Sequence, residues 1–138
     1  MPIFLKNKFI FRVFTMTDIV DIDQLKKLLH DFAVIRDWTK FHNPKNLSMA
    51  LAVEAGELLE IFQWMSDNHA NQVKNDMEIV KKTQHELADI MLYLIRIAAL
   101  MDINLSEAVL NKIKLNNEKY PVELVKGSAK KYTEYAKN

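Results

Sequence analysis

The stretch AVEAGELLEIFQW, residues 52–64, carries carboxylates inside a segment that otherwise has the pattern of a core helix. At about 3.6 residues per turn, one face of this helix would hold the apolar side chains of Leu47, Leu51, Leu58, Phe62 and Met65. Glu54 falls on the same face, and a buried carboxylate without a partner costs several kcal/mol. We therefore expect Glu54 to be neutralised by a proton, a cation or a metal ion.

The composition limits the fold class and the partners. A chain of 138 residues is long enough for one domain with a real core, and 2 Gly and 3 Pro beside 49% hydrophobic residues predict long helices. With 19 basic and 18 acidic residues the net charge is +1, which argues against a nucleic-acid surface. The absence of cysteine excludes disulfides and thiolate metal sites, and it fits a cytoplasmic protein.

The two ends of the chain differ from its middle. Residues 1–15, MPIFLKNKFIFRVFT, are too short and too charged to span a membrane, and no signal-peptide cleavage pattern follows them. Because Met16 looks like a more natural start, we interpret residues 1–15 as an extension, either an ordinary strand or loop (9–14 alternate as a strand would) or the product of a mis-assigned start codon. Residues 16–125 are predicted to form the functional domain, and residues 126–138 a basic tail.

Four helical segments are predicted, over about 22–40, 45–65, 76–101 and 105–118. Pro44 favours the start of the second, and Pro121 the end of the fourth. From residue 87 to 101 only Asp89 and Arg96 are polar, which is typical of a helix at the centre of a bundle or of a subunit interface. We therefore expect an all-α, four-helix bundle that forms a homo-oligomer, either a dimer or a tetramer. Arg96 is expected to pair with a carboxylate, within the chain or across the interface.

Two carboxylate pairs stand on successive helices. Glu54 and Glu57 are three residues apart, and so are Glu86 and Asp89. On facing antiparallel helices these pairs would form a ring of four carboxylates, which needs cations; oxygen ligands alone favour Mg²⁺ or Mn²⁺, and Mg²⁺ usually completes its shell with substrate phosphates. A di-iron bundle would need Glu-x-x-His repeats, and a Glu is missing three residues before each of His30, His42, His69 and His85.

The spacing ExxE, 28 residues, ExxD resembles the signature of the all-α nucleoside triphosphate pyrophosphohydrolases of the MazG-like group. The chain is similar above all to their dCTP pyrophosphatase branch. The blocks that carry this resemblance are RDWTKFHNPKNL (36–47), ELLEIFQW (57–64), KIKLNNEKYPVE (112–123) and KGSAKKYTE (126–134).

The resemblance implies Mg²⁺-dependent hydrolysis of a nucleoside triphosphate, dCTP or a modified dCTP, to the monophosphate and pyrophosphate. Such an activity would serve dNTP pool sanitation. It assigns metal binding and catalysis to Glu54, Glu57, Glu86 and Asp89. It assigns the base pocket to Trp38, His42, Trp64 and Tyr93, and phosphate contacts to Lys112 and Asn116. Glu60 is either a residue that orients water or a solvated helix residue.

The sequence does not decide which base is preferred. Animal members have a His where this chain has Leu29, and His30 lies one position away, on another side of the helix. Two alternatives therefore stand beside dCTP: the same chemistry on dUTP or on a broad range of dNTPs, and a non-enzymatic helical interaction module with a structural ion.

Overall fold

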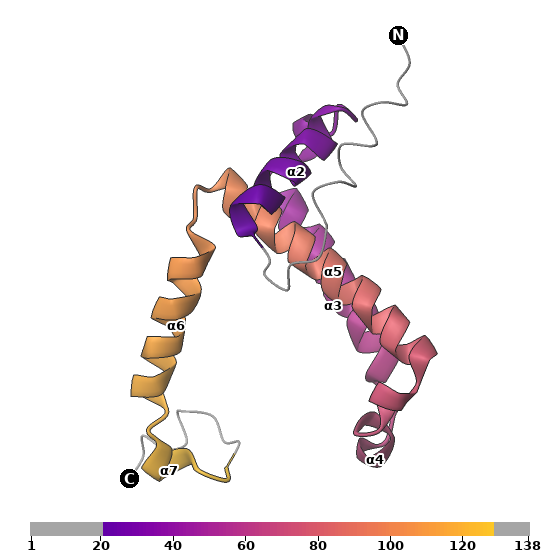
Figure 1. Ribbon diagram of the computed structural model, residues 1–138, viewed down its shortest axis with the longest axis vertical. Helices are drawn as coiled ribbons and strands as arrows, with labels where there is room; N and C mark the ends of the chain where they lie inside the picture. The colour runs from indigo at the N-terminus through magenta and orange to yellow at the C-terminus, as the bar shows by residue number, and fades with distance from the viewer. Residues whose placement is uncertain (1–20, 129–138) are drawn as a thin grey trace. The chain divides into compact units, whose positions relative to one another are not determined.

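The computed structural model describes residues 21–128, and every regular element there is helical (Figure 1). The elements are α2 (Ile22–Val34), η2 (Thr39–Phe41), α3 (Pro44–Phe62), α4 (Asp67–Ala70), η3 (Val73–Asn75), α5 (Met77–Leu100), α6 (Leu105–Lys119) and α7 (Val122–Val125). The all-α prediction is confirmed. The predictions for residues 1–15, for the alternating stretch 9–14 and for residues 129–138 of the tail lie outside the described residues.

The second predicted helix begins where its capping residues place it. The side chain of Asn43 accepts a hydrogen bond from the backbone N–H of Asn46 at 2.9 Å, and Pro44 occupies the first turn. The side-chain amide of Asn46 in turn donates to the carbonyl oxygen of Phe41 at 2.9 Å. These local contacts attach η2 firmly to the start of α3.

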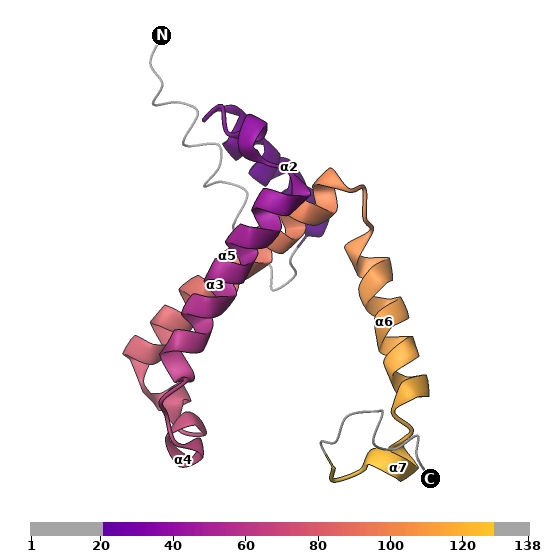
Figure 2. The same cartoon turned by 180° about the vertical axis from the view of Figure 1, so that it is seen from behind.

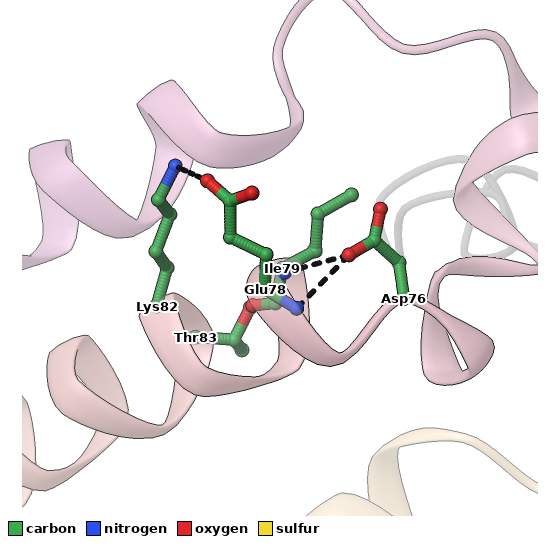
Figure 3. Close-up of polar contacts among 5 residues, drawn as sticks. All are labelled: Asp76, Glu78, Ile79, Lys82 and Thr83. Atoms are coloured by element: carbon green, nitrogen blue, oxygen red, sulfur yellow. Dashed lines mark hydrogen bonds and ion pairs between the residues drawn. The ribbon is translucent and has the colours of Figure 1, made fainter.

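The long helix α5 begins at an equally clear cap (Figure 3). The carboxylate of Asp76 accepts hydrogen bonds from the backbone N–H groups of Glu78 and Ile79 at 3.0 and 3.2 Å. One turn later Lys82 forms an ion pair with Glu78 at 2.7 Å, and the Thr83 hydroxyl donates to the carbonyl oxygen of Ile79 at 2.8 Å. The cap and the following turn fix the residue at which α5 begins.

The first helix is shorter than predicted, because α2 ends at Val34 rather than near residue 40. Asp37 adopts a left-handed conformation with φ of 54°, and the backbone N–H of Trp38 turns back to the carbonyl oxygen of Ala33 at 2.9 Å. Aspartate tolerates this conformation better than most residues, so the chain can leave the helix here without a glycine. The Trp38 ring then meets the Phe32 ring edge-on, with centroids 5.9 Å apart.

α3 and α5 lie side by side and antiparallel, joined through α4 and η3, and α2 packs against α5 (Figures 1 and 2). The apolar residues that this arrangement buries within residues 21–128 are Ala33, Leu47, Ile95 and Ala98. Large apolar side chains stay exposed on both long helices, among them Met49, Val53, Leu59, Leu87, Met91 and Leu94. A pair of helices covers only the two stripes that face each other, which explains why this core is thin.

The chain divides after Asp102 into two units. In the second unit, the Asn104 side chain caps α6 by accepting from the N–H of Glu107 at 3.1 Å, and the helix ends at Lys119, just before Pro121. The four-helix bundle and the oligomer stay predictions. Within residues 21–128, no helix combines the length and the apolarity needed to cross a membrane.

Candidate functional site

The antiparallel pairing of α3 and α5 brings three of the four predicted carboxylates together. Glu54 and Glu57 from α3 and Glu86 from α5 each offer an oxygen, and these oxygens all lie within 4.8 Å of one another. Glu54 and Glu86 are half-buried, whereas Glu57 is exposed. Three oxygens at this separation could converge on one cation, as the pattern of the two acidic pairs predicted.

Asp89, the fourth predicted ligand, lies one turn after Glu86 and is half-buried. It is not one of the three residues whose oxygens cluster within 4.8 Å. Its charge nevertheless acts on the site, since it raises the pKa of Glu54 and that of Tyr93. Asp89 therefore borders the cluster, and its role as a ligand stays a prediction.

The electrostatics explain how a carboxylate can occupy the apolar stripe. Burial raises the pKa of Glu54 above its usual value of 4.5, and the charges of Glu57, Asp89 and Glu86 and a hydrogen bond with Glu86 raise it further. The protein therefore favours either a proton or a cation at this position. The donor set consists of carboxylate oxygens alone, which fits a hard divalent cation such as Mg²⁺ or Mn²⁺.

A groove of about 740 Å³ runs beside the carboxylates, between α3 and α5. The groove is lined by the polar residues Glu57, Glu86, Glu60 and Lys82 and by the apolar residues Ala52, Val53, Ile61, Met65 and Ile79. Gly56 also lines the groove, and a Cβ atom added there would meet no atom within 4 Å. The volume lies in the range of small-molecule sites in proteins. Lys82 was missed by the sequence analysis, although it stands one turn before Glu86 and so on the same face of α5.

One predicted base-pocket residue, Tyr93, belongs to α5, and a second, His42, contacts α5. Tyr93 is half-buried, and burial together with the charges of Glu54 and Asp89 raises the pKa of its phenol, so this residue lies close to the acidic cluster. His42, also half-buried, follows η2 and contacts α5 through Arg96. The side-chain Nε of Arg96 donates to Nδ1 of His42 at 3.2 Å.

The carboxylate partner predicted for Arg96 is not found among residues 21–128. Arg96 is buried, with 6% of its surface exposed, and within residues 21–128 no carboxylate lies at ion-pair distance from it. The acidic residue that precedes it on this side of the helix, Asp89, is two turns or about 10 Å away along the axis. The residue that contacts the Arg96 side chain is instead His42, which directly follows η2. An ion pair of Arg96 across a subunit interface stays a prediction.

The two tryptophans are not core residues of the single chain. Trp38 is 46% exposed and Trp64 89% exposed. They also flank opposite ends of α3, a helix of 19 residues and therefore about 28 Å long. One chain consequently cannot bring Trp64 to the same base as Trp38 and His42. Lys112 and Asn116 are exposed on α6, in the second unit, and stay predicted phosphate contacts.

Comparison with known proteins finds a family profile and several relatives that match this chain. A MazG-like family profile matches residues 49–135, which include both acidic pairs. The chain is 41% identical to dCTP pyrophosphatase 1 of Mus musculus and 39% identical to that of Homo sapiens, in each case over 113 residues, or 82% of this chain and 66% of the relative. The chain thus spans just under two thirds of the length of these curated relatives.

A solved structure agrees with these matches. The crystal structure of a pyrophosphatase from Archaeoglobus fulgidus is similar to this chain with a TM-score of 0.67 and 34% sequence identity. The similarity covers 78% of this chain and 99% of that one.

Proposed function

This chain belongs to the MazG-like family, in its dCTP pyrophosphatase branch, and we propose that it hydrolyses dCTP or a modified dCTP to the monophosphate and pyrophosphate. The observation that carries the proposal is the cluster of Glu54, Glu57 and Glu86, whose oxygens approach within 4.8 Å beside an open groove. The similarity to dCTP pyrophosphatase 1 of mouse and human supports the substrate class. The absence of cysteine fits the reducing cytoplasm in which a dNTP pool would be kept clean.

The four carboxylates of Glu54, Glu57, Glu86 and Asp89 would hold Mg²⁺, or Mn²⁺ in its place. When bound, the ion supplies positive charge to the phosphate oxygens and makes hydrolysis at phosphorus feasible at neutral pH. The oxygens of three of these side chains lie within 4.8 Å of one another, so little reorganisation would be needed before the phosphates bind.

The remaining polar residues of the groove would serve the phosphates and the attacking water. Water adds to the α-phosphorus, the bond from that phosphorus to the bridging oxygen breaks, and pyrophosphate leaves. Glu60 lines the groove outside the three-carboxylate cluster and would be available to orient that water. Lys82, which also lines the groove, would balance phosphate charge.

The base would lie between aromatic side chains contributed by two copies of the chain. Trp38 and His42 lie at one end of α3 and Trp64 at the other, about 28 Å away. Exposed apolar residues follow both α3 and α5, as expected for helices that are covered in an oligomer. We therefore place Trp64 of a second copy against the base held by Trp38, His42 and Tyr93.

The function is tested by measuring pyrophosphate release from a panel of dNTPs, including dUTP, with Mg²⁺ and with EDTA. We expect dCTP or a modified dCTP to be hydrolysed fastest, no release in EDTA, and loss of release in Glu54→Gln. A matched control is Glu118→Gln, the same chemical change on the exposed surface of α6. No pyrophosphate from any nucleotide, or release that EDTA leaves unchanged, would overturn the proposal; fastest hydrolysis of dUTP would overturn the substrate.

A further inference from the structure

The contact between Arg96 and His42 determines where the proton of the imidazole lies. Arg96 donates from Nε to Nδ1 of His42 at 3.2 Å, across 54 residues of sequence. A guanidinium has no acceptor atom and keeps its proton under all ordinary conditions. Nδ1 must therefore be the unprotonated nitrogen, and in the neutral ring the proton sits on Nε2.

The surroundings also keep this imidazole neutral. Burial lowers the pKa of His42 below 6.5, and the charge of Arg96 lowers it further. Lys40, the other cation on the same turn, is engaged in an ion pair with Asp37. A second proton on the ring would place an N–H donor against the Nε–H of Arg96 and a positive charge beside a buried one. His42 is thus a neutral residue with one fixed donor, Nε2–H.

The position of the pair along α5 connects it with the acidic cluster. Glu86, Asp89, Tyr93 and Arg96 follow one another at intervals of three, four and three residues, so they share one stripe of the helix. From Asp89 to Arg96 the stripe is about 10 Å long. That length is comparable with a nucleoside monophosphate, so a nucleotide with its phosphates at the carboxylates can reach the Arg96–His42 end with its base.

We propose that Arg96 is a positioning residue for base recognition, which holds His42 in the neutral Nε2–H tautomer so that this nitrogen donates to an acceptor on the nucleobase edge. The inference rests on the proposed function and adds a reason for cytosine. N3 of cytosine is an acceptor, whereas N3 of uracil carries a hydrogen. A fixed donor facing this position can donate a hydrogen bond to N3 of cytosine. Against uracil it would face another donor, so no hydrogen bond could form.

Two substitutions separate the hydrogen bond from packing. The side-chain amide nitrogen of Arg96→Gln stands at the same place along the side chain as Nε of arginine, so this variant keeps a donor for Nδ1. Arg96→Met has a similar length but no donor. Arg96→Gln keeps a hydrogen-bond partner for His42, and Arg96→Met replaces a buried charge by an apolar side chain, which is often tolerated, so both variants are expected to fold.

The first readout is the ¹⁵N spectrum of the His42 ring in the full chain without nucleotide. In the wild-type protein we expect Nε2 protonated, Nδ1 unprotonated and a titration midpoint below 6.5, and we expect the same tautomer in Arg96→Gln. In Arg96→Met the ring should show both tautomers and titrate at higher pH than in the wild type. A proton on Nδ1 in the wild type, or an Arg96→Met spectrum identical to it, overturns the inference.

The second readout is the ratio of kcat/KM for dCTP to that for dUTP. We expect this ratio to fall roughly tenfold in Arg96→Met, the size of one lost hydrogen bond, and to be retained in Arg96→Gln. An unchanged ratio in an Arg96→Met enzyme that still turns over overturns the positioning role. If the wild-type chain hydrolyses no nucleotide, the proposed function fails and the recognition role fails with it, while the ring spectrum still reports the tautomer.

Discussion

Replacing Glu54 by glutamine should stabilise the protein in the absence of metal, although it removes a residue of the proposed active site. The oxygens of Glu54, Glu57 and Glu86 lie within 4.8 Å of one another, so each repulsion is at least ~0.9 kcal/mol in a medium as polar as water. At physiological salt, screening over this distance roughly halves the value. Losing two such repulsions gains about 1 kcal/mol, or a melting temperature about 3–5 °C higher for a domain of this size.

The assay is urea denaturation followed by circular dichroism, in EDTA and in millimolar Mg²⁺. In EDTA we expect Glu54→Gln to be more stable than the wild-type protein. In Mg²⁺ the order should reverse, because a cation that binds only the folded wild-type site stabilises it, whereas the variant has lost a ligand. The glutamine side chain has nearly the shape of glutamate, so packing around α3 should not change.

The control is again Glu118→Gln, which removes one negative charge from an exposed helix surface and should change stability by less than about 0.5 kcal/mol in either buffer. The reasoning is refuted if Glu54→Gln is less stable than the wild type in EDTA while Glu118→Gln is not. In that case the carboxylate would be a structural hydrogen-bond acceptor rather than a member of a mutually repelling ligand set.

Four further outcomes are expected. Trp64→Ala should raise KM for every dNTP by about 10–100-fold, the loss of one stacking contact, and should leave the fold of each chain intact, since Trp64 is 89% exposed on the single chain; a large loss of stability with unchanged KM would contradict the pocket. Gly56→Ala should gain about 0.5–1 kcal/mol of stability, because alanine favours a helix and its Cβ meets nothing within 4 Å. It should also raise KM if the nucleotide lies in the groove. Thermal melts measure the first effect and steady-state kinetics the second. The pKa of His42 is lowered from 6.5 in the folded state, so its contribution to stability is complete above pH 6.5 and is lost as the pH falls through the lowered pKa; denaturation curves of His42→Asn should show less of this loss. Sedimentation should detect a stable oligomer at micromolar concentration, and a monomer would contradict the shared pocket.

Much of the fold follows from local features of the sequence. The starts of α3 and α5 agree with prediction to within about a residue, because Asn43 and Asp76 satisfy the free N–H groups of the first turn by contacts only two or three residues long. The two acidic pairs could also be predicted from the sequence, since side chains three residues apart on a helix share a face. Two antiparallel helices that face each other through these pairs predict a ring of four carboxylates, of which the structure clusters Glu54, Glu57 and Glu86.

Other features were decided only by the tertiary structure. Nothing local marks the left-handed Asp37 that ends α2, because aspartate adopts that conformation without requiring it. The partner of Arg96 depends on which segment crosses α5 at its level, and that segment lies 54 residues away and ends in a histidine. Trp64 and Trp38 flank one helical segment in the sequence, but the rise of α3 between them separates them by about 28 Å. Spacing along a chain predicts which side chains share a helix face, whereas the neighbours of that face are chosen by the packing of distant segments.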